Sequence, residues 1–154
     1  MTDQRGRLAK CGVAFSVIAI ILSGCATTPT SPSAATQIPK DRLLAFQERT
    51  PENNATLVVT RDEGYVGSAC YLSLSVNGTH AARFDVAETA EFYIAPGELL
   101  LRVGFDLMGQ MLCGIGKDHW TQRETILHAG ETKFFRLSID SNGQLDIQRA
   151  DPLR

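Results

Sequence analysis

Residues 70–86 read CYLSLSVNGTHAARFDV, and this stretch decides the fold class. From Cys70 to Val76 every second residue is apolar and the residues between them are tyrosine or serine, which is the two-residue period of a strand with one buried face. Asn77-Gly78 follows at once, and the same period returns in the last five residues of the stretch. Asn-Gly between alternating runs is the strongest short-range hairpin signal, because a type I′ turn needs positive φ at both central residues. The stretch therefore predicts two antiparallel strands joined by a tight turn.

The same period recurs on both sides of this hairpin. It appears in the runs 55–60, 92–94, 99–105, 125–127, 135–139 and 145–147. Turn residues separate the runs, with Pro96-Gly97, Gly130 and Asn142-Gly143 in three of the gaps. This spacing predicts an all-β fold, a single antiparallel β-sandwich of about seven to eight strands, as the domain over residues 40–154. One short helical stretch is expected over residues 40–47.

The composition is that of a globular protein without a surplus of positive charge. The 154 residues are 44% hydrophobic and 21% charged, and 15 basic residues face 17 acidic ones for a net charge of −2. A surface that binds nucleic acid needs clustered positive charge, so nucleic acid is excluded as an expected partner. The length is that of one ordinary domain with or without tails.

Residues 1–24 have the organisation of an export signal. Arg5, Arg7 and Lys10 form a positive start, and an uncharged apolar run follows over residues 11–22. This run is too short to cross a membrane as a helix, which takes roughly 20 residues. The segment therefore predicts a signal peptide rather than a membrane anchor.

The apolar run ends in Leu22-Ser23-Gly24-Cys25, which resembles the lipobox of bacterial lipoproteins. The resemblance implies cleavage between Gly24 and Cys25, with N-palmitoyl and S-diacylglycerol groups on Cys25. Ala26 stands where an aspartate would signal retention in the inner membrane, so the resemblance implies a protein lipid-anchored in the outer membrane and facing the periplasm. The alternative is an ordinary secretory signal with an incidental cysteine.

Residues 25–39 are expected to form a flexible linker. After Cys25 they read ATTPTSPSAATQIP, an uncharged stretch of small polar residues and prolines. Such a segment buries too little apolar surface to order itself, and proline favours an extended chain. Its expected role is that of a spacer between the lipid and the domain.

Two of the four cysteines remain for the domain itself. Cys11 leaves with the signal peptide and Cys25 takes the lipid, which leaves Cys70 and Cys113. In the oxidising periplasm an even pair in an exported domain is most simply a disulfide. A metal pair or a catalytic thiol is the alternative, although two cysteines so far apart lack the close spacing of zinc ligands.

The longest expected connection covers residues 106–122. It carries Met108, Met111 and the only tryptophan, Trp120, and Arg123 follows it. Long connections in compact domains are usually functional or disordered. One hypothesis makes these four side chains a partner contact, since an exposed tryptophan would anchor recognition. The favoured hypothesis is that Trp120 and the methionines close one end of the core.

The remaining polar residues predict no catalytic, metal or cofactor site. His80, His119 and His128 lack the spacing of a metal-binding motif. Asp118-His119 would suit catalysis only with a serine, and the chain has no G-x-S-x-G elbow. We therefore expect no enzyme, no metal and no cofactor, while a small-molecule ligand stays open.

Three further motifs carry a resemblance to a family of small uncharacterised lipoproteins of Gram-negative envelopes. They are ATLVVTRD at residues 55–62, APGE at 95–98 and GETKFFRL at 130–137. The resemblance implies a β-sandwich similar to transthyretin and to peptidase-regulatory domains, without assigned activity or catalytic residues. The expected function is a non-catalytic binding or structural module that contacts an envelope protein. An accessory role in an envelope or secretion assembly such as type VI secretion is the alternative, and an envelope hydrolase is less favoured.

Overall fold

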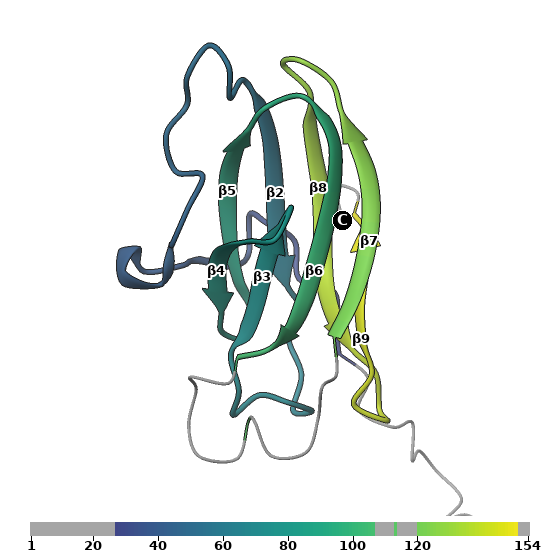
Figure 1. The fold of residues 1–154 in the computed structure, drawn as a ribbon. Helices are drawn as coiled ribbons and strands as arrows, with labels where there is room; N and C mark the ends of the chain where they lie inside the picture. Colours follow the sequence, from purple (N-terminus) through teal and green to yellow (C-terminus); the bar gives the residue numbers. More distant parts are fainter. Residues whose placement is uncertain (1–26, 107–112, 114–119, 151–154) are drawn as a thin grey trace, which may run out of the picture.

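The computed structural model describes residues 27–106, 113 and 120–150, which form two β-sheets packed face to face (Figure 1). The predicted all-β sandwich is confirmed. The strands are β1 Thr36–Gln37, β2 Ala55–Arg61, β3 Leu72–Val76, β4 Thr79–Phe84, β5 Glu88–Ile94, β6 Gly97–Phe105, β7 Trp120–Leu127, β8 Thr132–Ile139 and β9 Leu145–Arg149. A turn of 3₁₀ helix, η1, spans Lys40–Arg42.

The strands divide into a sheet of five and a sheet of four. The order in the first is β1-β5-β2-β8-β9 and the order in the second is β4-β3-β6-β7. Neighbouring strands are antiparallel except at two places, where β1 pairs with β5 and β2 pairs with β8 in parallel. The described residues thus contain one strand more than the upper end of the prediction, because the two-residue β1 is too short to show a period in the sequence.

The hairpin expected in residues 70–86 is present as β3 and β4. Leu72, Leu74 and Val76 face the core and are at most 1% exposed. Asn77 and Gly78 form the turn with φ angles of 48° and 81°, the positive pair that a type I′ turn requires. Both the alternation and the turn chemistry of this stretch are therefore confirmed.

The core lies between the two sheets, and β2 is buried along its whole length. The sequence suggested burial of one face only, but the N-terminal segment passes close to the outer face, where Pro29, Thr30 and Pro32 share a small hollow with the buried Thr60. The largest fully buried side chains are Phe84, Phe92, Phe135, Leu57, Leu72, Leu74, Leu101, Leu127, Leu137, Ile139, Ile147 and Val59.

The N-terminal segment lies against the sandwich, which corrects the flexible linker expected over residues 25–39. Thr28 and Glu63 exchange two backbone hydrogen bonds of 2.7 and 3.1 Å. Further along, β1 pairs with β5, and Ile38 is only 5% exposed. A proline-rich composition prevents a segment from forming a core of its own, but it does not prevent docking on a sheet edge with unpaired backbone groups. Residues 25 and 26 lie outside the described residues.

Residues 40–47 do not form the short helix that was expected, beyond the single turn of η1. Leu43 forms a bridge with Ala82, and the backbone N–H of Leu44 donates to the carbonyl of Ala81 at 2.8 Å. These bonds go to β4, which is an edge strand with free backbone groups. Pairing with that edge replaces helical hydrogen bonding in this segment.

Several connections meet at one end of the sandwich, where β2, β4, β6 and β8 all end (Figure 1). We call it the disulfide end; its described parts are residues 62–71, 85–87 and 140–144 together with Cys113. The sulfur atoms of Cys70 and Cys113 lie 2.17 Å apart and their Cα atoms 5.5 Å apart, which is disulfide geometry, as predicted. The pair joins the connection after β2 to the connection after β6.

The connection after β6 is shorter than the stretch 106–122 predicted from the sequence, because β7 already begins at Trp120. The strand is polar over residues 121–125, which hides its period. Polar residues on both faces are common in edge strands, and β7 is the edge of its sheet.

Within the described residues we find no helix with the length and apolarity to span a membrane.

Candidate functional site

A concave patch on the outer face of the four-stranded sheet is the best candidate for a functional site. It carries Ser73, Ser75, His80, Arg102 and Trp120, which we call the tryptophan face. These five residues border a hollow of about 470 Å³ whose remaining lining is formed by Leu44, Arg83, Gly104, Phe105 and Asp106.

Strand register brings the tryptophan face together. Ser73 and Ser75 point outward because the residues on either side of them in β3 point into the core. Arg102 lies opposite Ser75 across the β3–β6 ladder, and Trp120 lies opposite Gly104 across the β6–β7 ladder. A glycine has no side chain, so the position opposite Trp120 leaves room for the indole ring over the sheet.

Trp120 is 51% exposed, so the expectation that it closes the core is wrong. As the first residue of β7 it points to the outer face of the sheet, whereas Val66 and Phe105 pack against the core. The guanidinium carbon of Arg102 lies 4.2 Å from the centre of the indole ring, which is a cation–π contact. The exposed ring is therefore held in place by its neighbour.

His80 forms a second contact within the tryptophan face. Its Nδ1 lies 3.1 Å from Ser73 Oγ and 3.3 Å from Ser75 Oγ. A serine beside a histidine is one part of a nucleophilic site, which also needs donors aimed at a developing oxyanion. The backbone of β3 is paired on both sides, with β4 and β6, so its N–H groups lie in the sheet plane and not toward the hollow. This arrangement fits ligand contact better than covalent catalysis.

An ion pair borders the hollow on the side of β4. Arg83 Nε and Asp106 Oδ2 lie 2.7 Å apart, and the Asp106 side chain is almost fully shielded from water. The two charges compensate each other at the border. Arg102 and the hydroxyl groups of β3 therefore give the hollow a positive and hydrogen-bonding character beside an aromatic ring.

Trp120 and Arg123, the two described residues of the predicted partner contact, do not lie in one patch. Trp120 faces outward, whereas Arg123 reaches toward β9 of the other sheet, where it bonds to the backbone oxygen of Ile147 and lies 3.2 Å from Asp146. The register explains this, because Arg123 pairs with the inward-facing Leu101 while Trp120 pairs with Gly104. Met108 and Met111 lie outside the described residues.

Three other positions considered from the sequence lie outside the described residues, namely Gly24, Cys25 and His119. His128 is exposed in the turn after β7, where its backbone N–H donates to Glu131. In the described parts of the chain, no group of three or more histidine, cysteine or acidic residues is arranged to hold a metal ion.

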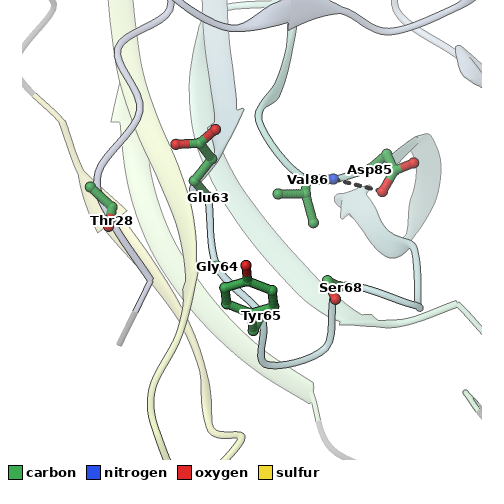
Figure 2. A pocket seen from close by; sticks show the side chains of 7 residues that line it. All are labelled: Thr28, Glu63, Gly64, Tyr65, Ser68, Asp85 and Val86. Carbon is green, nitrogen blue, oxygen red and sulfur yellow. Dashed lines mark hydrogen bonds between the residues drawn. The ribbon is translucent and has the colours of Figure 1, made fainter. Parts of the chain in front are cut away.

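A second hollow, of about 680 Å³, lies at the disulfide end. Figure 2 shows its lining, with Thr28 on one side, Asp85 and Val86 on the other, and Tyr65 near Ser68. Tyr65 is 86% exposed, the highest value among the large apolar side chains of the described residues. This hollow could not be predicted from the sequence, because its lining comes from segments far apart in the chain.

A buried arginine braces the connection that carries Tyr65. Arg61 is 2% exposed, and its guanidinium donates hydrogen bonds of 2.7 to 2.9 Å to the carbonyl oxygens of Gly67, Cys70 and Phe84. Burial lowers the pKa of Arg61 to about 10, which leaves it charged at neutral pH. Its charge is thus used to hold backbone oxygens and not to contact a ligand.

Asp62, the next residue, is also buried. Burial raises the pKa of Asp62, although Arg136 Nη1 lies 3.6 Å from its Oδ2 and opposes the rise. The carboxylate also accepts a hydrogen bond of 3.3 Å from the backbone N–H of Thr30. It therefore links the N-terminal segment to the end of β2.

A scan against protein-family models and a search of curated proteins each found no match for this chain.

Proposed function

We propose that this protein is an outer-membrane lipoprotein, anchored through lipids on Cys25 and facing the periplasm, whose sandwich is a non-catalytic binding module for an envelope protein. The order of positive start, apolar run and lipobox in residues 1–25 supports the anchor. The resemblance to small Gram-negative envelope lipoproteins supports the same class. The pairing distance of Cys70 and Cys113 suits an oxidising compartment.

The observation that carries the binding role is the stacking of Arg102 on the half-exposed Trp120. Tryptophan and arginine are among the residue types most enriched at the energetic centres of protein interfaces. Because the two side chains already hold each other, they lose less conformational entropy when a partner binds. The positive charge of Arg102 and the hydroxyls of Ser73 and Ser75 favour a partner segment with an acidic residue at its centre.

The anchor is tested by the substitution Cys25→Ser in cells fed radioactive palmitate. We expect the variant to lose the label and to accumulate as an unprocessed precursor. Cys11→Ser is the matched control, because Cys11 belongs to the same leader and leaves with it. Labelling of the Cys25→Ser variant at the wild-type level would contradict the lipid anchor.

The contact surface is tested in two stages. A photo-crosslinking amino acid at Gln122, an outward position of β7, is expected to trap the partner in intact cells, whereas the same group at Glu91 on the other sheet is not. The trapped protein is then purified and titrated with the wild type and with Trp120→Ala. Loss of a central interface residue costs about 2 kcal/mol or more, which is roughly a thirtyfold weaker affinity.

Ile126→Ala is the matched control for this titration. Ile126 is 50% exposed and lies on the same strand and the same face as Trp120, but away from Arg102. We expect it to bind the partner as the wild type does. Equal affinities of all three proteins would contradict the tryptophan face as the contact surface.

A further inference from the structure

The N-terminal segment fixes where the sandwich is attached to the rest of the chain. Thr28 and Glu63 exchange two backbone hydrogen bonds of 2.7 and 3.1 Å. Thr27 packs so closely on Gly64 that a Cβ atom added to this glycine would lie 2.7 Å from Thr27 Cγ2. The Thr27 hydroxyl also bonds to the buried Asp62. From Thr27 onward the chain is thus held on the sandwich.

Only two residue steps separate Thr27 from Cys25. An extended residue spans at most about 3.6 Å, so the Cα atoms of Thr27 and Cys25 lie within about 7 Å of each other. A free spacer up to residue 39 would have reached roughly 40 Å. The lipid attachment point is therefore close to the disulfide end, where Thr27 and Thr28 meet residues 62–64.

We infer that the disulfide end rests on the membrane surface, with Tyr65 at the depth of the lipid headgroups. The inference rests on the proposed lipid anchor at Cys25. Tyr65 is 86% exposed and lines the same hollow as Thr28, next to the attachment point (Figure 2). A tyrosine ring is apolar and its hydroxyl is polar, which suits the boundary between lipid and water.

The charges at this end define the lipid surface that fits it. Glu63 and Asp85 line the hollow beside Tyr65 and give its border a negative character. Attraction to anionic headgroups would require basic residues instead, and the described residues 62–71, 85–87 and 140–144 of this end include no lysine or arginine. The surface in contact is therefore zwitterionic lipid, held by the anchor and by Tyr65.

This placement orients the whole domain. The strands rise from the membrane, and β6, with nine residues, is about 30 Å long, which sets the height of the opposite end. Trp120 is the first residue of β7 and so lies toward the disulfide end. The tryptophan face is thus presented sideways and near the lipid, where it meets a partner that is held in or on the same membrane.

The test uses the mature lipidated full chain in phosphatidylcholine vesicles that contain lipid spin-labelled on the headgroup. The first variant is Tyr65→Trp with Trp120→Phe, which moves the tryptophan signal to position 65. The matched control is Ala129→Trp with Trp120→Phe, which places it in the turn at the opposite end. A third variant adds a Gly-Ser spacer of about 15 residues between Ala26 and Thr27, whose average reach is roughly 20 Å.

We expect the tryptophan at position 65 to lose most of its fluorescence to the headgroup quencher and the tryptophan at position 129 to keep it. The spacer should restore the fluorescence at position 65 while the protein still floats with the vesicles. Equally weak quenching at both positions, in a protein that floats, would overturn the orientation and leave the anchor intact. A mature protein that does not float with vesicles would overturn the anchor and the orientation together.

Discussion

The guanidinium of Arg61 donates a hydrogen bond of 2.9 Å to the carbonyl oxygen of Phe84, across from β2 to the end of β4. The same side chain holds two carbonyl oxygens of the connection after β2. One buried cation thus links the two sheets at the disulfide end and fixes the segment that presents Tyr65. Its pKa, lowered by burial to about 10, keeps this link charged at neutral pH.

Replacing Arg61 should destabilise the protein strongly. In Arg61→Met three carbonyl oxygens lose the guanidinium, although that of Gly67 keeps the backbone N–H of Cys70 at 3.1 Å. Each buried group left without a partner costs about 1–3 kcal/mol. Arg61→Lys should recover only part of the loss, because an ammonium group lacks the planar fork that reaches several acceptors. Urea unfolding of the mature protein measures the effect. Arg149→Met, on an exposed side chain, is the control and is expected to stay within about 0.5 kcal/mol of wild type.

Trp120→Ala should leave the thermal stability nearly unchanged. The indole is half exposed, so its removal creates no cavity in the core. Leu101→Ala, on the inner face of β6, is the contrasting variant and should cost about 2–5 kcal/mol. Thermal melting followed by circular dichroism compares the two. A large loss in Trp120→Ala would mean that the ring supports the core after all.

The pairing of Cys70 and Cys113 should be found as a linked peptide in the non-reduced mature protein. The two residues are 43 positions apart, for which the chain-entropy model gives a stabilisation of about 4 kcal/mol. The double variant Cys70→Ser/Cys113→Ser should lose about that amount in urea unfolding. Alkylation of both thiols in the unreduced, denatured wild type would contradict the linkage.

Asp62 should give the free energy of unfolding a measurable dependence on pH. Because burial raises its pKa in the folded protein above the ordinary value of 3.8, the folded state holds this proton more tightly than the unfolded chain. Stability from this group is therefore present at low pH and is lost as the pH rises through the raised pKa. Relative to Asp62→Asn, the wild type should gain stability as the pH falls from about 7 to about 4. A wild type that loses stability relative to Asp62→Asn on acidification would show that the pKa is not raised.

The parts of the fold that the sequence predicts are those set by neighbouring residues. The alternation that ends at Val76 and the turn at Asn77-Gly78 depend on a few consecutive positions, and both match the structure. The pairing of Cys70 with Cys113 was predictable for another reason, since only two cysteines remain for the domain. Local period and simple counting therefore identified the sandwich and its cross-link.

The tryptophan face was not predictable, because distant pairing decides it. Whether Trp120 is buried depends on its register against Gly104, and that register is set by the whole β6–β7 ladder. His80 meets Ser73 only because a bulge shifts β4 against β3 at Ser75. The docking of Thr28 could not be predicted from composition either, because composition indicates only that the segment cannot form a core of its own.

The parallel pairing of β2 with β8 has a consequence for how the chain folds. Thr56 lies beside Thr132, so the middle strand of the five-stranded sheet, β2, meets its neighbour β8 only after most of the domain has been made. Pairing such distant segments costs loop-closure entropy before the contacts between them can stabilise the sheet. Proteins rich in such pairings fold in milliseconds to seconds. Until β8 arrives, β2 offers an unpaired apolar edge that invites association with other chains. Productive folding thus waits for the last strands of the domain, and a chain cut short before β8 is expected to aggregate instead of forming a smaller sandwich.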